Sequence, residues 1–170
     1  TGMSPYDVIF DGEGARNILE VGGGSFVLFD NISFVNGDNT MGGAVAANSA
    51  VIGFSDMIFE NNSATSGGAI GATNYAYVDV YDSQVLGNVA TYGGAFYSED
   101  GSAINVDAGT ETIVSDNSAD YGAVAYSEYG FFDQPLSGGG LIDFSGNVSS
   151  TADFYPVSYT HLRAHETFRY

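Results

Sequence analysis

Short apolar runs separated by Gly, Asn, Asp and Ser recur along the chain from its first residues to Tyr155. Each run is rich in Val, Ile, Phe and Tyr, and is too short and too β-branched to predict a helix. The runs occupy residues 25–34, 50–59, 76–85, 109–114 and 140–144. No segment keeps the 3.6-residue apolar period of an amphipathic helix. The pattern therefore predicts an all-β chain.

A Gly/Asn-rich corner follows each run, and in three copies it leads to Gly-Gly-Ala and a further apolar residue. These copies are FVNGDNTMGGAV from Phe34, FENNSATSGGAI from Phe59 and VLGNVATYGGAF from Val85. A fourth, from Val114, reads as one residue shorter, with Tyr121 in place of its first Gly, and a fifth, from Phe144, ends before its glycines. The corner positions are Gly37, Asn62, Asn88, Asn117 and Asn147, spaced 25, 26, 29 and 30 residues apart.

A repeat of this length cannot bury an apolar face alone, so successive copies must stack on one another. The sequence therefore predicts a right-handed, single-stranded parallel β-helix of about five coils of 25–30 residues, stacked ~4.8 Å apart. Three inward columns are expected: Phe34, Phe59, Val85, Val114 and Phe144; Phe29, Phe54 and Val80; and Val45, Ile70, Phe96 and Val124. A β-sandwich or antiparallel barrel would show hairpin turns every 8–12 residues, and leucine-rich repeats a shorter, leucine-rich unit.

The recurring asparagines and glycines have structural interpretations. An amide at a corner can bond to the turn backbone, and amides in successive coils can stack as a ladder of Asn62, Asn88, Asn117 and Asn147. The structural glycines are the pairs Gly42 and Gly43, Gly67 and Gly68, and Gly93 and Gly94. They resemble phosphate-binding loops only superficially, because no helix and no Lys-Ser/Thr follows them. Glycine here allows positive φ and close approach of coils.

An acidic column lies three residues before the first inward column and comprises Asn31, Asp56, Asp82 and Glu111. Carboxylates stacked at strand spacing repel one another, so either solvent screens them or a cation bridges them. Asp56, Asp82 and Glu111 are thus candidate calcium ligands, calcium being the hard cation that takes clustered carboxylates. The competing interpretation is an ordinary solvated face, and no compact calcium-binding loop motif is present. No other cofactor and no catalytic residue is predicted.

Composition narrows the possible partners. The chain has 170 residues, 21 of them acidic, with three arginines and no lysine, for a net charge of −18. Such a charge argues against nucleic acids and anionic membrane surfaces as partners. The chain has no cysteine, and no apolar run long enough to span a membrane.

The last fifteen residues differ abruptly from the rest. They hold both histidines, two of the three arginines and one acid, whereas Arg16 is the single cation upstream. The segment PVSYTHLRAHET resembles one translated frame of a transposase adapter used in preparing shotgun sequencing libraries. We therefore predict a β-helix over residues 1–155 and a non-native tail over 156–170, and assign no chemistry to His161 or His165.

The repeat also resembles a known family. The pairing of F-x-x-N (Phe59 to Asn62, Phe144 to Asn147) with G-G-A-[ILV] (Gly42 to Val45, Gly67 to Ile70) is similar to the repeats of polymorphic outer-membrane proteins and related β-helical adhesin-like proteins. The resemblance covers about Tyr6 to Tyr155. It implies an exported, extracellular cell-surface protein that attaches to glycans or proteins of another cell. A five-coil stack without end caps further suggests a piece of a longer chain, whose other parts would be its neighbours.

The rival expectation is a polysaccharide lyase or glycoside hydrolase, because parallel β-helices also carry such enzymes. A lyase of this kind usually needs a basic residue beside calcium-binding acids, and a hydrolase needs carboxylates clustered on one face. Only Arg16 could be that base, and it is expected one or more coils away from Asp56, Asp82 and Glu111. The sequence therefore favours a non-enzymatic, adhesin-like or structural function.

Overall fold

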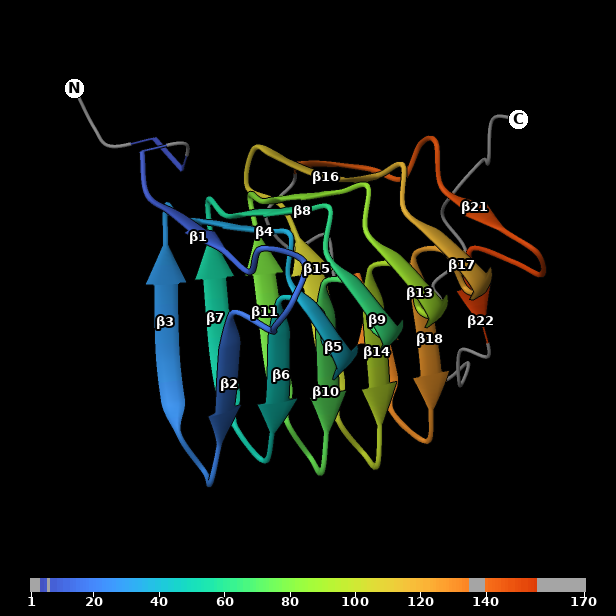
Figure 1. The fold of residues 1–170 in the computed structure, drawn as a ribbon, viewed down its shortest axis with the longest axis horizontal. Coiled ribbons are helices and arrows are strands. Elements are labelled where there is room, and N and C mark those ends of the chain that lie inside the picture. Colours follow the sequence, from blue (N-terminus) through green and yellow to red (C-terminus); the bar gives the residue numbers. More distant parts are fainter. Residues whose placement is uncertain (1–3, 6, 135–139, 156–170) are drawn as a thin grey trace.

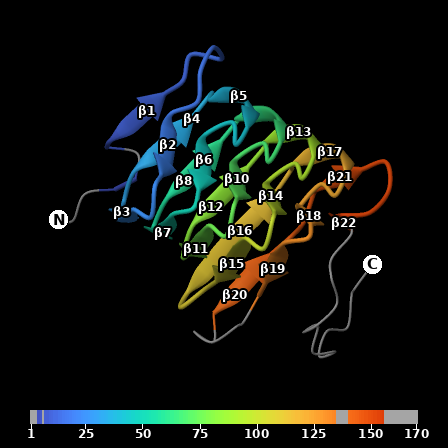
Figure 2. The same cartoon turned by 90° about the horizontal axis from the view of Figure 1, so that it is seen from below.

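The computed structural model describes residues 4–5, 7–134 and 140–155, and within them the chain forms strands and no helices. The strands build a parallel β-solenoid of about five turns, seen from the side in Figure 1 and after a 90° turn in Figure 2. Each full turn contributes one strand to each of four sheets, which run along the axis. The predicted all-β, stacked-coil architecture is confirmed.

The four sheets are parallel throughout. The first contains β1 (Ile9–Asp11), β4 (Ser33–Val35), β8 (Ile58–Glu60), β12 (Gln84–Leu86), β16 (Glu111–Ser115) and β20 (Leu141–Asp143). The second contains β2 (Leu19–Gly22), β6 (Val45–Asn48), β10 (Ile70–Thr73), β14 (Phe96–Glu99), β18 (Ala125–Glu128) and β22 (Phe154–Tyr155). The third contains β3 (Phe26–Asp30), β7 (Val51–Ser55), β11 (Tyr77–Tyr81), β15 (Ala103–Asp107) and β19 (Phe131–Asp133). The fourth contains β5 (Asp38–Met41), β9 (Ser63–Ser66), β13 (Val89–Tyr92), β17 (Ser118–Tyr121) and β21 (Val148–Ser149).

The inward columns agree with the sequence at all positions but one. Phe34, Phe59, Val85 and Val114 pair in register, as do Phe29, Phe54 and Val80. In the third column, however, Phe96 pairs with Ala125 rather than Val124. Val124 is buried, but it lies one position before the column.

That error comes from the alignment of the fourth copy. The backbone N–H of Gly93 donates to Tyr121 O and that of Gly94 to Gly122 O, which puts Gly122 opposite Gly93. The fourth copy is therefore not shorter, and Tyr121 does not replace its first glycine. Instead Ala123 stands at the position of Gly94, and the small Ala125 takes the column position that Phe96 holds one turn earlier.

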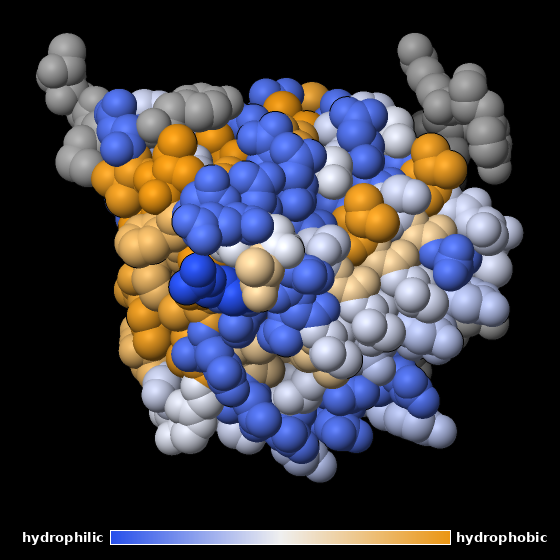
Figure 3. All heavy atoms as spheres, viewed as in Figure 1, coloured by the Kyte–Doolittle hydropathy of each residue, from blue (hydrophilic) through white to orange (hydrophobic). Residues whose placement is uncertain are grey.

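The core changes character along the axis. Phe29, Phe34, Phe54 and Phe59 form an aromatic cluster in the N-terminal half, with ring centroids 5.1–6.4 Å apart. Val80, Val85, Val106 and Val114 follow it in the middle turns. Exposed apolar side chains gather at the N-terminal end, on the left of Figure 3, where Phe26 and Leu28 lie on the edge strand β3. The predicted tail over 156–170 lies outside the described residues.

Candidate functional site

The predicted asparagine ladder is present, and it runs through the corner between the first and fourth sheets. Asn62, Asn88 and Asn117 are fully buried, and each Nδ2 donates to the Oδ1 of the next asparagine at 2.9–3.0 Å. The same Oδ1 atoms also accept the backbone N–H of the residue one turn earlier, beginning with Gly37 N to Asn62 Oδ1 at 2.8 Å.

Each buried amide is completed by a backbone carbonyl. The Nδ2 of Asn62 donates to Phe34 O, that of Asn88 to Phe59 O and that of Asn117 to Val85 O, at 3.0–3.2 Å. Asn88 and Asn117 each donate two and accept two hydrogen bonds, which uses the ordinary capacity of an amide, and Asn62 donates two and accepts one, from Gly37 N. These side chains therefore join successive turns. Gly37 begins the column without an amide because a Cβ there would lie 2.2 Å from Gly43 O.

The glycine pairs also have structural roles. The first glycine of each pair has positive φ, between 62° and 68° at Gly42, Gly67 and Gly93, and Gly122 repeats this at 67°. The second lies against the backbone of the next turn: a Cβ on Gly68 would be 2.1 Å from Gly94 O, and one on Gly94 2.4 Å from Ala123 O. These contacts set how closely the turns stack, and they agree with the interpretation drawn from the sequence.

The acidic column is interrupted by an insertion. Tyr81 pairs with Asp107, 26 residues on, whereas Gln84 pairs with Ile113, 29 residues on, so three extra residues lie between β15 and β16. The Oδ1 of Asp82 accepts the backbone N–H groups of Gly109, Thr110 and Glu111 at 2.8–3.2 Å and anchors this loop. Asp56 and Asp82 both occupy left-handed corner positions, with φ of 52° and 45°.

Calcium binding at this column stays a prediction. Among the residues that the structure describes, no group of three or more His, Cys, Asp or Glu side chains is placed to hold a metal ion. The residues that could contribute are Asp56, Asp82 and Glu111, with the insertion between the last two. The prediction is tested by whether calcium raises the midpoint of thermal unfolding and whether Asp56→Asn removes that rise.

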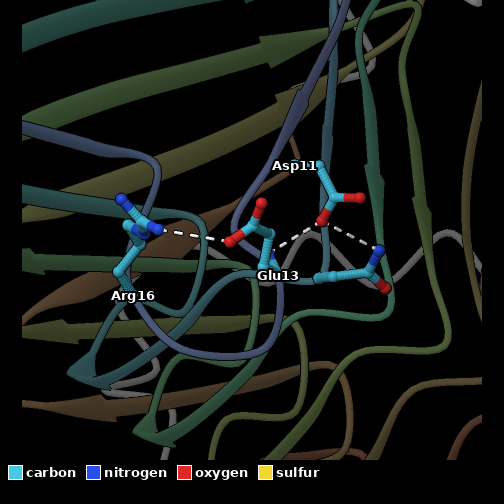
Figure 4. Close-up of polar contacts among 4 residues, drawn as sticks. Asp11, Glu13 and Arg16 are labelled. Atoms are coloured by element: carbon cyan, nitrogen blue, oxygen red, sulfur yellow. Dashed lines mark hydrogen bonds and ion pairs between the residues drawn. The ribbon is translucent and has the colours of Figure 1, made fainter.

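Arg16 lies at the N-terminal end of the solenoid, in the connection between β1 and β2. Its Nη2 lies 3.2 Å from Glu13 Oε2, and both side chains are exposed. Asp11 Oδ1 accepts the Glu13 N–H and, at 3.1 Å, the Asn36 Nδ2 (Figure 4). Asp11, Glu13 and Arg16 line a shallow hollow with Phe10 and Ile18. Arg16 is thus an exposed side chain paired with a surface carboxylate.

Two pairs of tyrosines form an outward-facing cluster that the sequence analysis did not identify. Tyr92 and Tyr121 stack with ring centroids 5.3 Å apart and planes 13° apart, and Tyr97 and Tyr126 stack at 5.7 Å and 8°. Tyr92 also meets Tyr126 edge to face at 5.1 Å, which joins the pairs across the corner between the fourth and second sheets. We call these four residues the tyrosine cluster.

Two glutamates adjoin the tyrosine cluster. Glu99 and Glu128 end β14 and β18 and pair directly across these strands. The Tyr97 hydroxyl lies 2.8 Å from Glu99 Oε2 and 3.4 Å from Glu128 Oε2. Burial of the Tyr97 ring, and then its hydrogen bond to Glu99, raise the pKa of Tyr97 far above its ordinary value. Tyr97 therefore stays a neutral hydrogen-bond donor throughout the physiological pH range.

The signal for this cluster is in the sequence. Tyr92 and Tyr121, Tyr97 and Tyr126, and Glu99 and Glu128 are each 29 residues apart, the spacing of Asn88 and Asn117. Tabulating polar outward positions in the same register as the apolar ones would have revealed the cluster. It was missed because, outside the core, only the asparagine and acidic columns were followed across the repeat.

Comparison of the chain with protein-family models, with curated protein sequences and with solved structures gave no match. Within the described part of the chain, no helix has the length and apolar character needed to cross a membrane.

Proposed function

We propose that this chain is part of an exported, cell-surface adhesin-like protein that attaches to glycans or proteins of another cell. The parallel solenoid supports the proposal because stacked turns present continuous outer faces on which side chains repeat at strand spacing. The repeat's likeness to polymorphic outer-membrane proteins and related adhesin-like proteins gives the finer form of the proposal.

The proposal rests on the different roles of the inward and outward residues. The asparagines and glycines that recur in the repeat join successive turns. The side chains left to meet a partner are those of the outer faces, and they include the tyrosine cluster with Glu99 and Glu128. Aromatic residues are enriched at sites where proteins bind other molecules.

The proposal is tested with fluorescent beads that carry the purified full chain. The beads should attach to a subset of a panel of cells, and free chain should compete with them. Beads carrying the heat-unfolded chain are the matched control, since they have the same composition and charge without the solenoid. Equal attachment of folded and unfolded chains, or none above background across the panel and a glycan array, would contradict the proposal.

Glycoside hydrolysis is the second candidate, favoured by one observation. Hydrolases use two carboxylates on one face, and Glu99 and Glu128 both lie within hydrogen-bonding reach of one tyrosine hydroxyl. The test is release of reducing ends from a panel of polysaccharides by the full chain. Turnover that Glu99→Gln or Glu128→Gln abolishes would establish the hydrolase, whereas binding without turnover would favour the adhesin.

A further inference from the structure

We propose that the tyrosine cluster, together with Glu99 and Glu128, is a docking surface for a basic polypeptide segment, with arginine side chains as its anchors. The inference rests on the proposed adhesive function and names the ligand class of its binding face. It is carried by the carboxylate pair, by the aromatic rings beside that pair and by the charge of the chain.

The negative charges of Glu99 and Glu128 repel each other, and one tyrosine hydroxyl cannot offset both. Glu99 and Glu128 face outward from neighbouring strands in direct register, an arrangement in which like charges destabilise a sheet. The Tyr97 hydroxyl has one hydrogen and can donate it to one carboxylate at a time, although it lies within 3.4 Å of an oxygen of each. A cation placed between the two carboxylates would remove the repulsion and satisfy the remaining oxygens.

Guanidinium matches this site better than a point charge does. Its planar fork donates two parallel hydrogen bonds to carboxylates and stacks on aromatic faces. Tyr97 is only 5% exposed and holds the carboxylates in place, while Tyr121 is 38% exposed at the outer pair. The cluster thus offers a carboxylate anchor and an aromatic contact for cation–π attraction within two neighbouring turns.

The charge of the chain favours a basic partner over a neutral one. The net charge is −18, and the one arginine in the described ranges, Arg16, is paired with Glu13 at the N-terminal end. A surface of one sign attracts oppositely charged partners and speeds their association. A neutral glycan would gain nothing from this field, and an acidic one would be repelled.

A polypeptide is favoured over a cationic sugar because the anchors occur in successive turns. Glu99 and Glu128, like the stacked tyrosines, follow one another at strand spacing along the axis. An extended chain with arginine at alternate positions places its side chains at ~6.5–7 Å intervals on one face. One arginine of such a segment can lie between the two carboxylates, and the next arginine on the same face can reach the aromatic rings beside them.

The test measures binding of a labelled peptide of alternating arginine and glycine to the full chain, by fluorescence anisotropy at low and physiological salt. A glutamine–glycine peptide of equal length is the neutral control, and a chitosan oligosaccharide is the cationic sugar control. We expect the arginine peptide to bind, with affinity that falls as salt rises, and the glutamine peptide not to bind.

Matched variants separate this surface from general charge attraction. Glu99→Gln with Glu128→Gln should weaken binding about tenfold or more, because it removes the paired carboxylates and keeps their shape. Asp30→Asn with Glu20→Gln removes two exposed charges near the N-terminal end, away from the cluster, and should change affinity by less than about twofold. Tyr121→Leu should weaken binding about threefold through loss of the ring quadrupole.

A footprint on the unaltered chain guards against misfolded variants. Bound peptide should protect Tyr121 from nitration and leave the 82%-exposed Tyr75 reactive. Equal affinity of the two double variants, no protection of Tyr121, or binding of the chitosan oligosaccharide in preference to the peptide would overturn the inference. If beads carrying Glu99→Gln and Glu128→Gln still attach to cells as the parent does, the inference fails while the adhesive function stands.

Discussion

Replacing Asn88 by alanine removes the central rung of the asparagine ladder. The side chain is fully buried and makes four hydrogen bonds: it accepts from the N and Nδ2 of Asn62 and donates to Asn117 Oδ1 and Phe59 O. The alanine methyl group can make none of these hydrogen bonds, so their partners are left unpaired. Unpaired polar groups are costly in the low-polarity core.

The expected loss follows from those four bonds. A buried hydrogen bond contributes about 1 kcal/mol net, and a partner left unsatisfied costs about as much or more, so we expect the free energy of unfolding to fall by about 4 kcal/mol. A domain of this size has roughly 5–15 kcal/mol in total. Asn88→Ala should therefore shift the urea midpoint strongly, or leave the chain partly unfolded.

Asn48→Ala is the matched control. Asn48 is exposed, and its Oδ1 accepts one hydrogen bond of 3.2 Å from Asn74 Nδ2, so its loss should cost less than about 0.5 kcal/mol. Both variants are compared with the parent by urea unfolding followed by circular dichroism. If Asn88→Ala is no more destabilising than Asn48→Ala, the ladder does not hold the turns together as described.

Three further perturbations probe separate contacts by the same unfolding measurement. Gly94→Ala should lower the free energy of unfolding by about 1–3 kcal/mol, because its Cβ would lie 2.4 Å from Ala123 O. Gly53→Ala is the control and should be nearly neutral, because its Cβ would meet only the flexible Leu28 side chain. Equal effects of the two substitutions would contradict this packing. Asp82→Ala should lower the free energy of unfolding by about 3 kcal/mol, because three backbone N–H groups lose their acceptor. Asp82→Asn should lower it less, because the amide oxygen can still accept. Similar losses for the two variants would show that Asp82 does not anchor the loop. Burial raises the pKa of Tyr97. The contribution of the neutral Tyr97 side chain to the free energy of unfolding is therefore complete below about pH 10 and is lost as the pH rises further. Tyr97→Phe should therefore flatten the loss of stability above about pH 10, and an unchanged pH profile would refute that assignment.

The repeat made most of the fold predictable. Apolar columns and corner asparagines recur at nearly constant spacing, and stacking is the one arrangement that buries all of them together. The prediction failed at Val124, where Gly-Ala was aligned with the wrong residues of Gly-Gly-Ala. The hydrogen bonds of Gly93 and Gly94 resolve that ambiguity, because they fix the corner glycine as Gly122.

The outward face was less predictable than the core. Every turn buries its inward side chains, so these positions are apolar in each copy of the repeat and their pattern can be recognised in the sequence. Outward positions differ between turns: Tyr97 and Tyr126 stand in the column that Ala46 and Gly71 occupy earlier. The 29-residue spacing from Asn88 to Asn117 shows that this turn is longer. It does not show that the extra residues lie before Glu111 or that Asp82 holds them, because the apolar pattern is unchanged by the insertion.

The stacking of turns in register is the central claim, and a distance between its outer turns tests it most directly. Because the chain has no cysteine, Phe26→Cys and Phe131→Cys give two unique, exposed sites for spin labels. These positions belong to one column through Val51, Tyr77 and Ala103, four strand intervals apart, so their backbones should be about 19 Å apart. Double electron–electron resonance should give a narrow distribution near that value. A broad distribution centred several tens of ångströms higher, as for an unstacked chain, would contradict it.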